Sequence, residues 1–247
     1  MLYSQKGFGG SLSIHKLIVE WLIYNPGASN TTDAYDSFIR FCNTAMQSFS
    51  IAECLKKTQG QTSSPLWHDL RYGRVTASKI YEASRWLPRD LVLVSQILGA
   101  QKVKNNHAME RGRMLEPLVC AELEKVKKKN HVGLALNREY PIFGASPDGV
   151  MGDSVLEIKC PISEETFKKY FDSTMKKPSA KYAVQIMLQM LFFNKVKGLF
   201  VVAQPDFKET KNMKILEVHY DYHFMDNVLK RANNFWRESR YFSNHKN

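Results

Sequence analysis

The stretch from residue 146 to residue 160 constrains the fold of this chain more than any other part of the sequence. It reads SPDGVMGDSVLEIKC. The two glycines, Gly149 and Gly152, together with Asp153, favour a reversal of the chain. Side chains on a strand alternate between its two faces, and residues 155–160 fit that period of two. The stretch therefore predicts an antiparallel hairpin.

This hairpin also predicts a metal site. The strand period puts Glu157 and Lys159 on one face, while Leu156, Ile158 and Cys160 pack into the core on the other. The reversal brings the Asp148 carboxylate beside Glu157. Two adjacent carboxylates repel each other unless a divalent cation lies between them, and hard oxygen ligands favour Mg²⁺ or Mn²⁺ over zinc. Lys159 would then steady a phosphate or position an attacking water. The alternative is a solvated surface hairpin, since Asp-Gly turns and Glu-x-Lys strand pairs are common.

Two predicted helices carry further polar side chains. Glu116 precedes Pro117, and a proline either occupies the first turn of a helix or kinks it. The alternative role for Glu116 is a helix-start carboxylate favoured by the macrodipole. Gln185 and Gln189 lie four residues apart on one face of an apolar helix. Their amides need partners, which are either site groups or each other and the core backbone.

A third cluster lies in residues 67–78, which read WHDLRYGRVTAS. It offers two guanidiniums, from Arg71 and Arg74, and two hydroxyls, from Thr76 and Ser78. Placed near a predicted helix start, these groups suit a phosphate, because guanidiniums bind it with two bonds and helix starts expose N–H groups. The alternative is an ordinary arginine-bearing start of a surface helix.

The composition narrows the class of protein. An excess of 35 Lys plus Arg over 24 Asp plus Glu gives a formal net charge of +11, which predicts attraction to polyanions such as nucleic acid. The four cysteines (Cys42, Cys54, Cys120 and Cys160) have no Cys-x-x-Cys spacing, so we expect buried thiols and no zinc ribbon. The apolar runs are shorter than the ~18–20 residues that cross a bilayer. Residues 1–10 lack a secretory signal pattern. We expect an intracellular protein, nuclear in a eukaryotic host and otherwise cytoplasmic.

Hydrophobic periodicity outlines the elements. It predicts helices over 13–24, 34–55, 76–84, 91–98, 109–128, 183–193 and 225–241, and strands over 140–143, 154–160, 198–203 and 215–220. The polar stretch 59–65, with Gly, Ser and Pro, indicates a linker. We therefore expect a helical extension over residues 1–60, of unknown role, and an α/β domain over residues 61–247 with a central mixed β-sheet flanked by helices.

Four segments, taken together, resemble the YqaJ-type viral recombinase family, which includes the exonuclease of phage lambda, within the PD-(D/E)XK nuclease superfamily. They are WHDLRYGRVTAS, GRMLE at 112–116, SPDG with LEIKCP, and the glutamine helix from Tyr182. The resemblance covers about residues 61–206 and implies a restriction-endonuclease-like core. It also implies a metal-dependent DNA nuclease, a 5′-to-3′ exonuclease on double-stranded ends that serves recombination, repair or viral and mobile-element DNA.

The resemblance also implies a role for each motif residue. Asp148 and Glu157 would be metal ligands, the Ile158 carbonyl a third oxygen, Glu116 a supporting carboxylate, Lys159 the group that assists the attacking water, and Arg71 the contact to a terminal phosphate. Gln185 matches the family's glutamine helix more naturally than Gln189, although the family often spaces its glutamines two apart. The implied cofactor is Mg²⁺, with Mn²⁺ as a substitute and a second ion, and the implied assembly is a trimer around DNA.

Three alternatives stay open at this point. An endonuclease would share the same catalytic residues. A DNA-binding module that has lost catalysis is disfavoured by the intact Asp148, Glu157 and Lys159 set, because a carboxylate pair without its metal is costly to keep. The third alternative is that residues 1–60 bind a protein partner.

Overall fold

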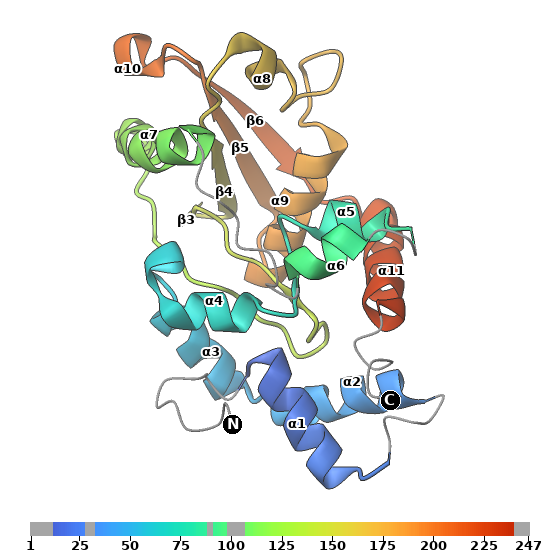
Figure 1. Ribbon diagram of the computed structural model, residues 1–247. Helices are drawn as coiled ribbons and strands as arrows, with labels where there is room; N and C mark the ends of the chain where they lie inside the picture. The colour runs from blue at the N-terminus through green and yellow to red at the C-terminus, as the bar shows by residue number, and fades with distance from the viewer. Residues whose placement is uncertain (1–11, 28–32, 88–90, 98–106, 240–247) are drawn as a thin grey trace. The chain divides into compact units, whose positions relative to one another are not determined.

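The computed structural model describes residues 12–27, 33–87, 91–97 and 107–239, and the chain forms two compact units (Figure 1). The first unit comprises residues 1–101, 133–146 and 229–247. The second comprises residues 102–132 and 147–228. Each unit is therefore assembled from segments that are separate in the sequence.

The first unit is mainly helical. Its elements are α1 (Ile14–Tyr24), α2 (Ala34–Ala45), α3 (Ser48–Lys57), the 3-10 turn η2 (Gln61–Ser63), α4 (Pro65–Arg71), α5 (Ile80–Ser84), α6 (Leu91–Ile97), the parallel pair β1 (Val75–Thr76) and β2 (Phe143–Gly144), and the last part of α11 (Tyr222–Glu238). Helix α4 starts where Pro65 follows Ser64, whose hydroxyl accepts a hydrogen bond from the Trp67 N–H, as is typical of a capped helix start.

Residues from the N-terminal helices share the core of this unit with α11. The Trp236 ring stacks on Phe38 of α2, with ring centroids 5.7 Å apart. Its indole N–H donates to the Gly73 carbonyl at 2.8 Å. The Tyr35 hydroxyl donates to the Asn233 side chain. The end of α11 therefore completes a core that begins in α1 and α2.

The second unit is a mixed four-stranded sheet with a helix on each face (Figure 1). The strands are β3 (Gly149–Met151), β4 (Ser154–Lys159), β5 (Lys197–Ala203) and β6 (Met213–His219), in that order. The outer pairs are antiparallel and β4 runs parallel to β5. Helices α8 (Glu164–Lys168) and α10 (Phe207–Thr210) lie in the connections. The predicted mixed sheet flanked by helices is thus confirmed.

The two long helices of this unit cover opposite faces of β4. Helix α7 (His107–Glu124) packs Leu115 and Val119 into one core cluster with Leu156 and Ile158. Helix α9 (Ala180–Phe193) contacts the face that carries Glu157. Apolar residues therefore fill one side of β4, as the strand period predicts, and α9 buries the polar side.

The predicted hairpin is confirmed. Gly149 lies opposite Leu156, and Met151 lies opposite Ser154. Gly152 in the turn has a φ of +63°, a backbone conformation that glycine adopts without strain. Because helices cover both faces, Glu157 is buried, and the alternative of a solvated surface hairpin is wrong.

Several predicted boundaries need correction. Residues 75–76 form a strand rather than the start of a helix, because they pair with residues 143–144, and α5 begins at Ile80 after Lys79 without a side-chain cap. Thr76 and Ser78 therefore do not cap it. The helix predicted over 34–55 breaks at residues 46–47, and α7 ends at Glu124. The strand predicted over 140–143 is reduced to β2. Residues 240–241 of the last predicted helix lie outside the described residues.

All four cysteines are free thiols, and Cys42, Cys54 and Cys120 are buried, as predicted. In the described part of the chain, no helix combines the length and the apolar character needed to span a membrane.

Candidate active site

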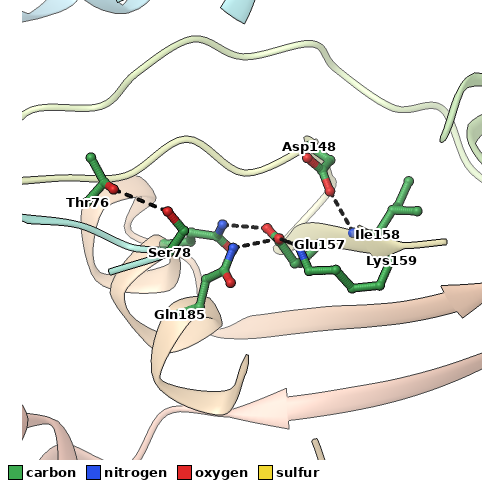
Figure 2. Close-up of polar contacts among 8 residues, drawn as sticks. Thr76, Ser78, Asp148, Glu157, Ile158, Lys159 and Gln185 are labelled. Carbon is green, nitrogen blue, oxygen red and sulfur yellow. Dashed lines mark hydrogen bonds and ion pairs between the residues drawn. The ribbon is translucent and has the colours of Figure 1, made fainter. Parts of the chain in front are cut away.

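Glu157 is the centre of the polar cluster in the second unit (Figure 2). The residue is only 2% exposed. Oε1 accepts hydrogen bonds from Gln185 Nε2 at 2.6 Å and from the Lys159 ammonium, and Oε2 accepts one from Gln189 Nε2 at 2.6 Å. A buried carboxylate persists only when its charge is paired and hydrogen-bonded. These three donors compensate for the burial of Glu157.

The two glutamines therefore bind the predicted site rather than each other. Residues four apart on a helix project from the same side, so α9 directs both amides at β4. The alternative that they pair with one another or with the core backbone is wrong. Gln189 is completely buried, and its Oε1 is a buried acceptor without a hydrogen-bond partner among the described residues.

Asp148 enters the cluster from the residue before β3. Its N–H donates to the Leu156 carbonyl at 2.9 Å, and its Oδ2 accepts a hydrogen bond from the Ile158 N–H at 2.6 Å (Figure 2). Burial, followed by the charges of Glu157 and Glu116, raises the pKa of Asp148 well above its usual value, although Lys159 and the Ile158 N–H oppose this. The hairpin has thus brought mutually repelling carboxylates together.

Lys159 supplies a positive charge beside them. Burial alone lowers the pKa of Lys159, but the charges of Glu157 and Asp148 and the hydrogen bond to Glu157 outweigh it and raise the pKa above the usual lysine value. The Lys159 ammonium also lies 5.8 Å from the centre of the Tyr182 ring. Lys159 therefore offers the cluster an ammonium that donates a hydrogen bond to Glu157.

Glu116 lies inside α7, directly before Pro117, which is within the helix. The alternative of a helix-start carboxylate is therefore wrong. Burial raises the pKa of Glu116, the Lys129 charge opposes this, and the Glu157 charge raises it further. These effects place Glu116 within electrostatic reach of the hairpin residues.

The oxygens of this cluster are of the kind that a hard divalent cation prefers. Each carboxylate oxygen can accept two hydrogen bonds or ligands, so Glu157 Oε2, with one donor, and Asp148 Oδ1 retain acceptor capacity. The partnerless Gln189 Oε1 is a further oxygen that a cation or its bound water would satisfy. Across the described ranges, no three His, Cys, Asp or Glu side chains are gathered closely enough to hold a metal ion. The ligand roles of Asp148, Glu157, Glu116 and the Ile158 carbonyl stay predictions.

The four residues of the predicted phosphate cluster lie in the first unit. Arg74 has a structural role there, whereas the other three stay candidates. Arg74 is 1% exposed, and its guanidinium donates to the carbonyls of Pro141, Leu70 and Leu12 at 3.0, 2.6 and 2.6 Å. With its donors turned to the backbone, Arg74 cannot meet a phosphate, so that prediction is wrong. A surface helix start is wrong as well, since Arg74 follows the end of α4 and is buried.

Arg71 is placed differently. Its guanidinium carbon lies 3.9 Å from the centre of the Trp67 ring, and the Trp67 indole donates to the Ser146 hydroxyl at 3.1 Å. Burial lowers the pKa of Arg71 to about 10. The Thr76 and Ser78 hydroxyls are 3.3 Å apart (Figure 2), with Thr76 buried and Ser78 exposed. Phosphate contacts by these three residues stay predictions.

One residue near the site was missed. Lys129 ends the lysine run 127–129, and it is only 6% exposed although Lys127 and Lys128 are exposed. Its ammonium donates to Cys120 Sγ at 2.9 Å and to the Asp148 carbonyl at 3.1 Å. The run of similar residues gives no local signal that distinguishes the buried lysine from its neighbours.

The mixed sheet flanked by helices is a fold of the PD-(D/E)XK-like exonuclease type. The profile of the YqaJ-like viral recombinase domain matches residues 66–195, and the chain belongs to that family.

Known proteins support this placement. The alkaline nuclease of human herpesvirus 6A (strain Uganda-1102) is 31% identical over 116 residues, a match that covers 47% of this chain and 23% of the relative. The matched part of this chain thus spans less than a quarter of that relative's length. The crystal structure of the alkaline exonuclease LHK-Exo from Laribacter hongkongensis matches with a TM-score of 0.56 and 28% identity, covering 70% of this chain and 91% of that one.

A more distant likeness concerns the fold alone. The Shutoff and Exonuclease Protein from Kaposi's sarcoma-associated herpesvirus matches with a TM-score of 0.53 and 11% identity, over 91% of this chain and 80% of that one. Residues 1–60 make up about a quarter of the chain. A match over 91% of the chain therefore extends into them.

Proposed function

We propose that this chain is a metal-dependent deoxyribonuclease that hydrolyses phosphodiester bonds, with 5′-to-3′ exonuclease activity on double-stranded DNA ends. The observation that carries the proposal is the buried Glu157 carboxylate, held by Lys159, Gln185 and Gln189 beside Asp148. Membership of the YqaJ-like family and the likeness to proteins named alkaline nuclease and alkaline exonuclease favour nuclease chemistry at this site.

Bound Mg²⁺ or Mn²⁺, proposed as two ions, would activate water and offset charge on the scissile phosphate. Asp148 and Glu157 would hold it, with the Ile158 carbonyl and Glu116 beside them. The protein's own contribution is positioning. Gln185 and Gln189 fix the orientation of the Glu157 carboxylate, and the Ile158 N–H fixes Asp148. The Lys159 ammonium, hydrogen-bonded to Glu157, orients the attacking water and stabilises negative charge on the phosphate.

Double-stranded DNA is the proposed partner, and the net charge of +11 supports attraction to it. Arg71, stacked on Trp67, would meet a terminal phosphate. The proposal further includes a homotrimer around DNA, a protein partner for residues 1–60, and action inside the cell on recombining, repaired or viral DNA.

The first experiment measures degradation of linear, 5′-phosphorylated duplex DNA with Mg²⁺, with EDTA, and beside a closed circular duplex. Asp148→Asn and Lys159→Ala remove the predicted machinery. Asp153→Asn is the matched control, because this carboxylate is exposed in the turn of the same hairpin. We expect loss of linear DNA alone, abolished by chelation and by both site substitutions, and unaffected by Asp153→Asn.

Two other outcomes would identify the alternatives. Cleavage of the closed circle would assign the site to an endonuclease. DNA binding without cleavage in either Mg²⁺ or Mn²⁺ would contradict the catalytic proposal and favour a DNA-binding module.

A further inference from the structure

Lys129 differs from its neighbours in the run of lysines after α7. Lys127 and Lys128 are exposed, whereas Lys129 is 6% exposed. Lysine is almost never fully buried unless its charge is paired. The chain is pinned here because Asn130 and Val150 exchange two backbone hydrogen bonds, of 2.8 and 3.0 Å. This bridge lays the segment beside β3, next to Asp148.

The Lys129 side chain joins two parts of the candidate site. Its ammonium donates to the main-chain carbonyl of Asp148 at 3.1 Å and to Cys120 Sγ of α7 at 2.9 Å. Helix α7 is the element that carries Glu116. One ammonium thus connects the backbone of one acidic residue to the helix that carries another.

The aliphatic part of Lys129 fits the hairpin equally closely. A Cβ atom on Gly149 would lie 2.5 Å from Lys129 Cδ and 2.6 Å from Cγ. Any side chain at residue 149 would push the Lys129 stem away. The residue after Asp148 therefore has to be small for Lys129 to reach its partners.

The Lys129 contact places a positive charge beside the acidic residues of the site. The charges of Glu157 and Glu116 both raise the pKa of Asp148, and the Lys159 ammonium donates to Glu157. Lys129 is the positive charge that acts most strongly on Glu116. The Lys129 ammonium also donates to the main-chain carbonyl of Asp148. It therefore restrains the position of the Asp148 backbone in addition to supplying positive charge.

We infer that Lys129 is a positioning residue, whose ammonium holds the main chain of Asp148 against α7 so that the Asp148 and Glu116 carboxylates are presented together. The presentation of these carboxylates to a cation rests on the proposed function, whereas the tether itself does not. A mere counter-ion has the opposite consequence for cation binding, because removing a positive charge near the carboxylates would strengthen it.

The test compares Lys129→Met with Lys128→Met, which removes the same charge from an exposed neighbour. In metal-free protein, we expect the amides of Asp148 and Val150 to exchange hydrogen at least about tenfold faster in Lys129→Met. We expect Mn²⁺ binding, measured by calorimetry, to weaken about 10–100-fold, as for other groups that orient metal ligands. Lys128→Met should change neither quantity more than about twofold. Lys129→Arg, which keeps charge and donors, should restore part of both.

A folded Lys129→Met protein with unchanged amide exchange and equal or tighter Mn²⁺ binding would overturn the inference. Should Lys129→Met fail to fold, Gly149→Ala displaces the Lys129 stem while keeping its charge, and unchanged exchange of the Asp148 amide would then overturn it. Wild-type protein that binds no Mn²⁺ would count against the proposed function, and the exchange rates of metal-free protein would still decide the role of Lys129.

Discussion

Replacing Arg74 with methionine tests whether this guanidinium stabilises the first unit or meets DNA. Its three carbonyl partners belong to segments up to 67 residues away in the sequence. A hydrogen bond from a charged group contributes roughly 1.5–3 kcal/mol, and a buried carbonyl left without a donor costs about 1–3 kcal/mol. Methionine keeps much of the apolar packing and removes a buried charge, which offsets part of the loss. We expect the free energy of unfolding to fall by about 3–5 kcal/mol.

Urea unfolding followed by circular dichroism measures this change, with Arg138→Met as the control. Arg138 is exposed, so its substitution should change the free energy of unfolding by less than about 0.5 kcal/mol. DNA affinity per folded molecule should stay the same in Arg74→Met. A loss of stability below about 1 kcal/mol, together with weaker DNA binding by folded protein, would refute the structural role.

Four further predictions concern the candidate site. Gln185→Leu removes one hydrogen bond to Glu157 and should raise the Mg²⁺ concentration that gives half of the maximal initial rate about 10–100-fold. An unchanged Mg²⁺ titration would contradict this. The folded-state pKa of Asp148 is raised. Between the usual pKa of an aspartate and this raised pKa, the folded protein binds more protons than the unfolded chain, so its stability falls as the pH rises through that range. Asp148→Asn should therefore melt higher than wild type in EDTA at pH 8, with the gain lost in acid, and equal melting curves at every pH would count against it. Mn²⁺ at 100 times its Kd should stabilise the wild-type protein by about 2.7 kcal/mol and so raise its melting temperature. No rise in the melting temperature would argue against a metal site. Arg71→Met should weaken binding of 5′-phosphorylated duplex about tenfold relative to 5′-hydroxyl duplex, whereas equal losses would exclude a contact to the terminal phosphate.

The parts of the site that were predicted from sequence depend on local signals. The Pro-Asp-Gly turn and the period of two act within one hairpin, so they place Asp148, Glu157 and Lys159 together before any tertiary contact is known. The four-residue spacing likewise puts Gln185 and Gln189 on one side of α9. It does not say what they contact, because Glu157 belongs to a different element.

The parts that were missed depend on distant partners. Thr76 follows a helical pattern, but pairing with residue 144 makes it a strand residue. Arg74 looks like an anion-binding arginine until the carbonyls of Leu12 and Pro141 come within reach. Lys129 is buried because Asn130 bridges to Val150. In each case a contact between remote segments overrides what the neighbouring residues indicate.

The interleaving of the two units sets the order in which the chain can mature during synthesis. Chains emerge from the ribosome N-terminus first, and domains fold as units. The first unit begins at α1, yet it needs Trp236 to pack on Phe38 and to satisfy the Gly73 carbonyl. The whole second unit is translated between Gly73 and Trp236. The apolar surface of α2 therefore stays incompletely covered until α11 has left the ribosome. A nascent chain stalled before that helix would expose this surface to chaperones.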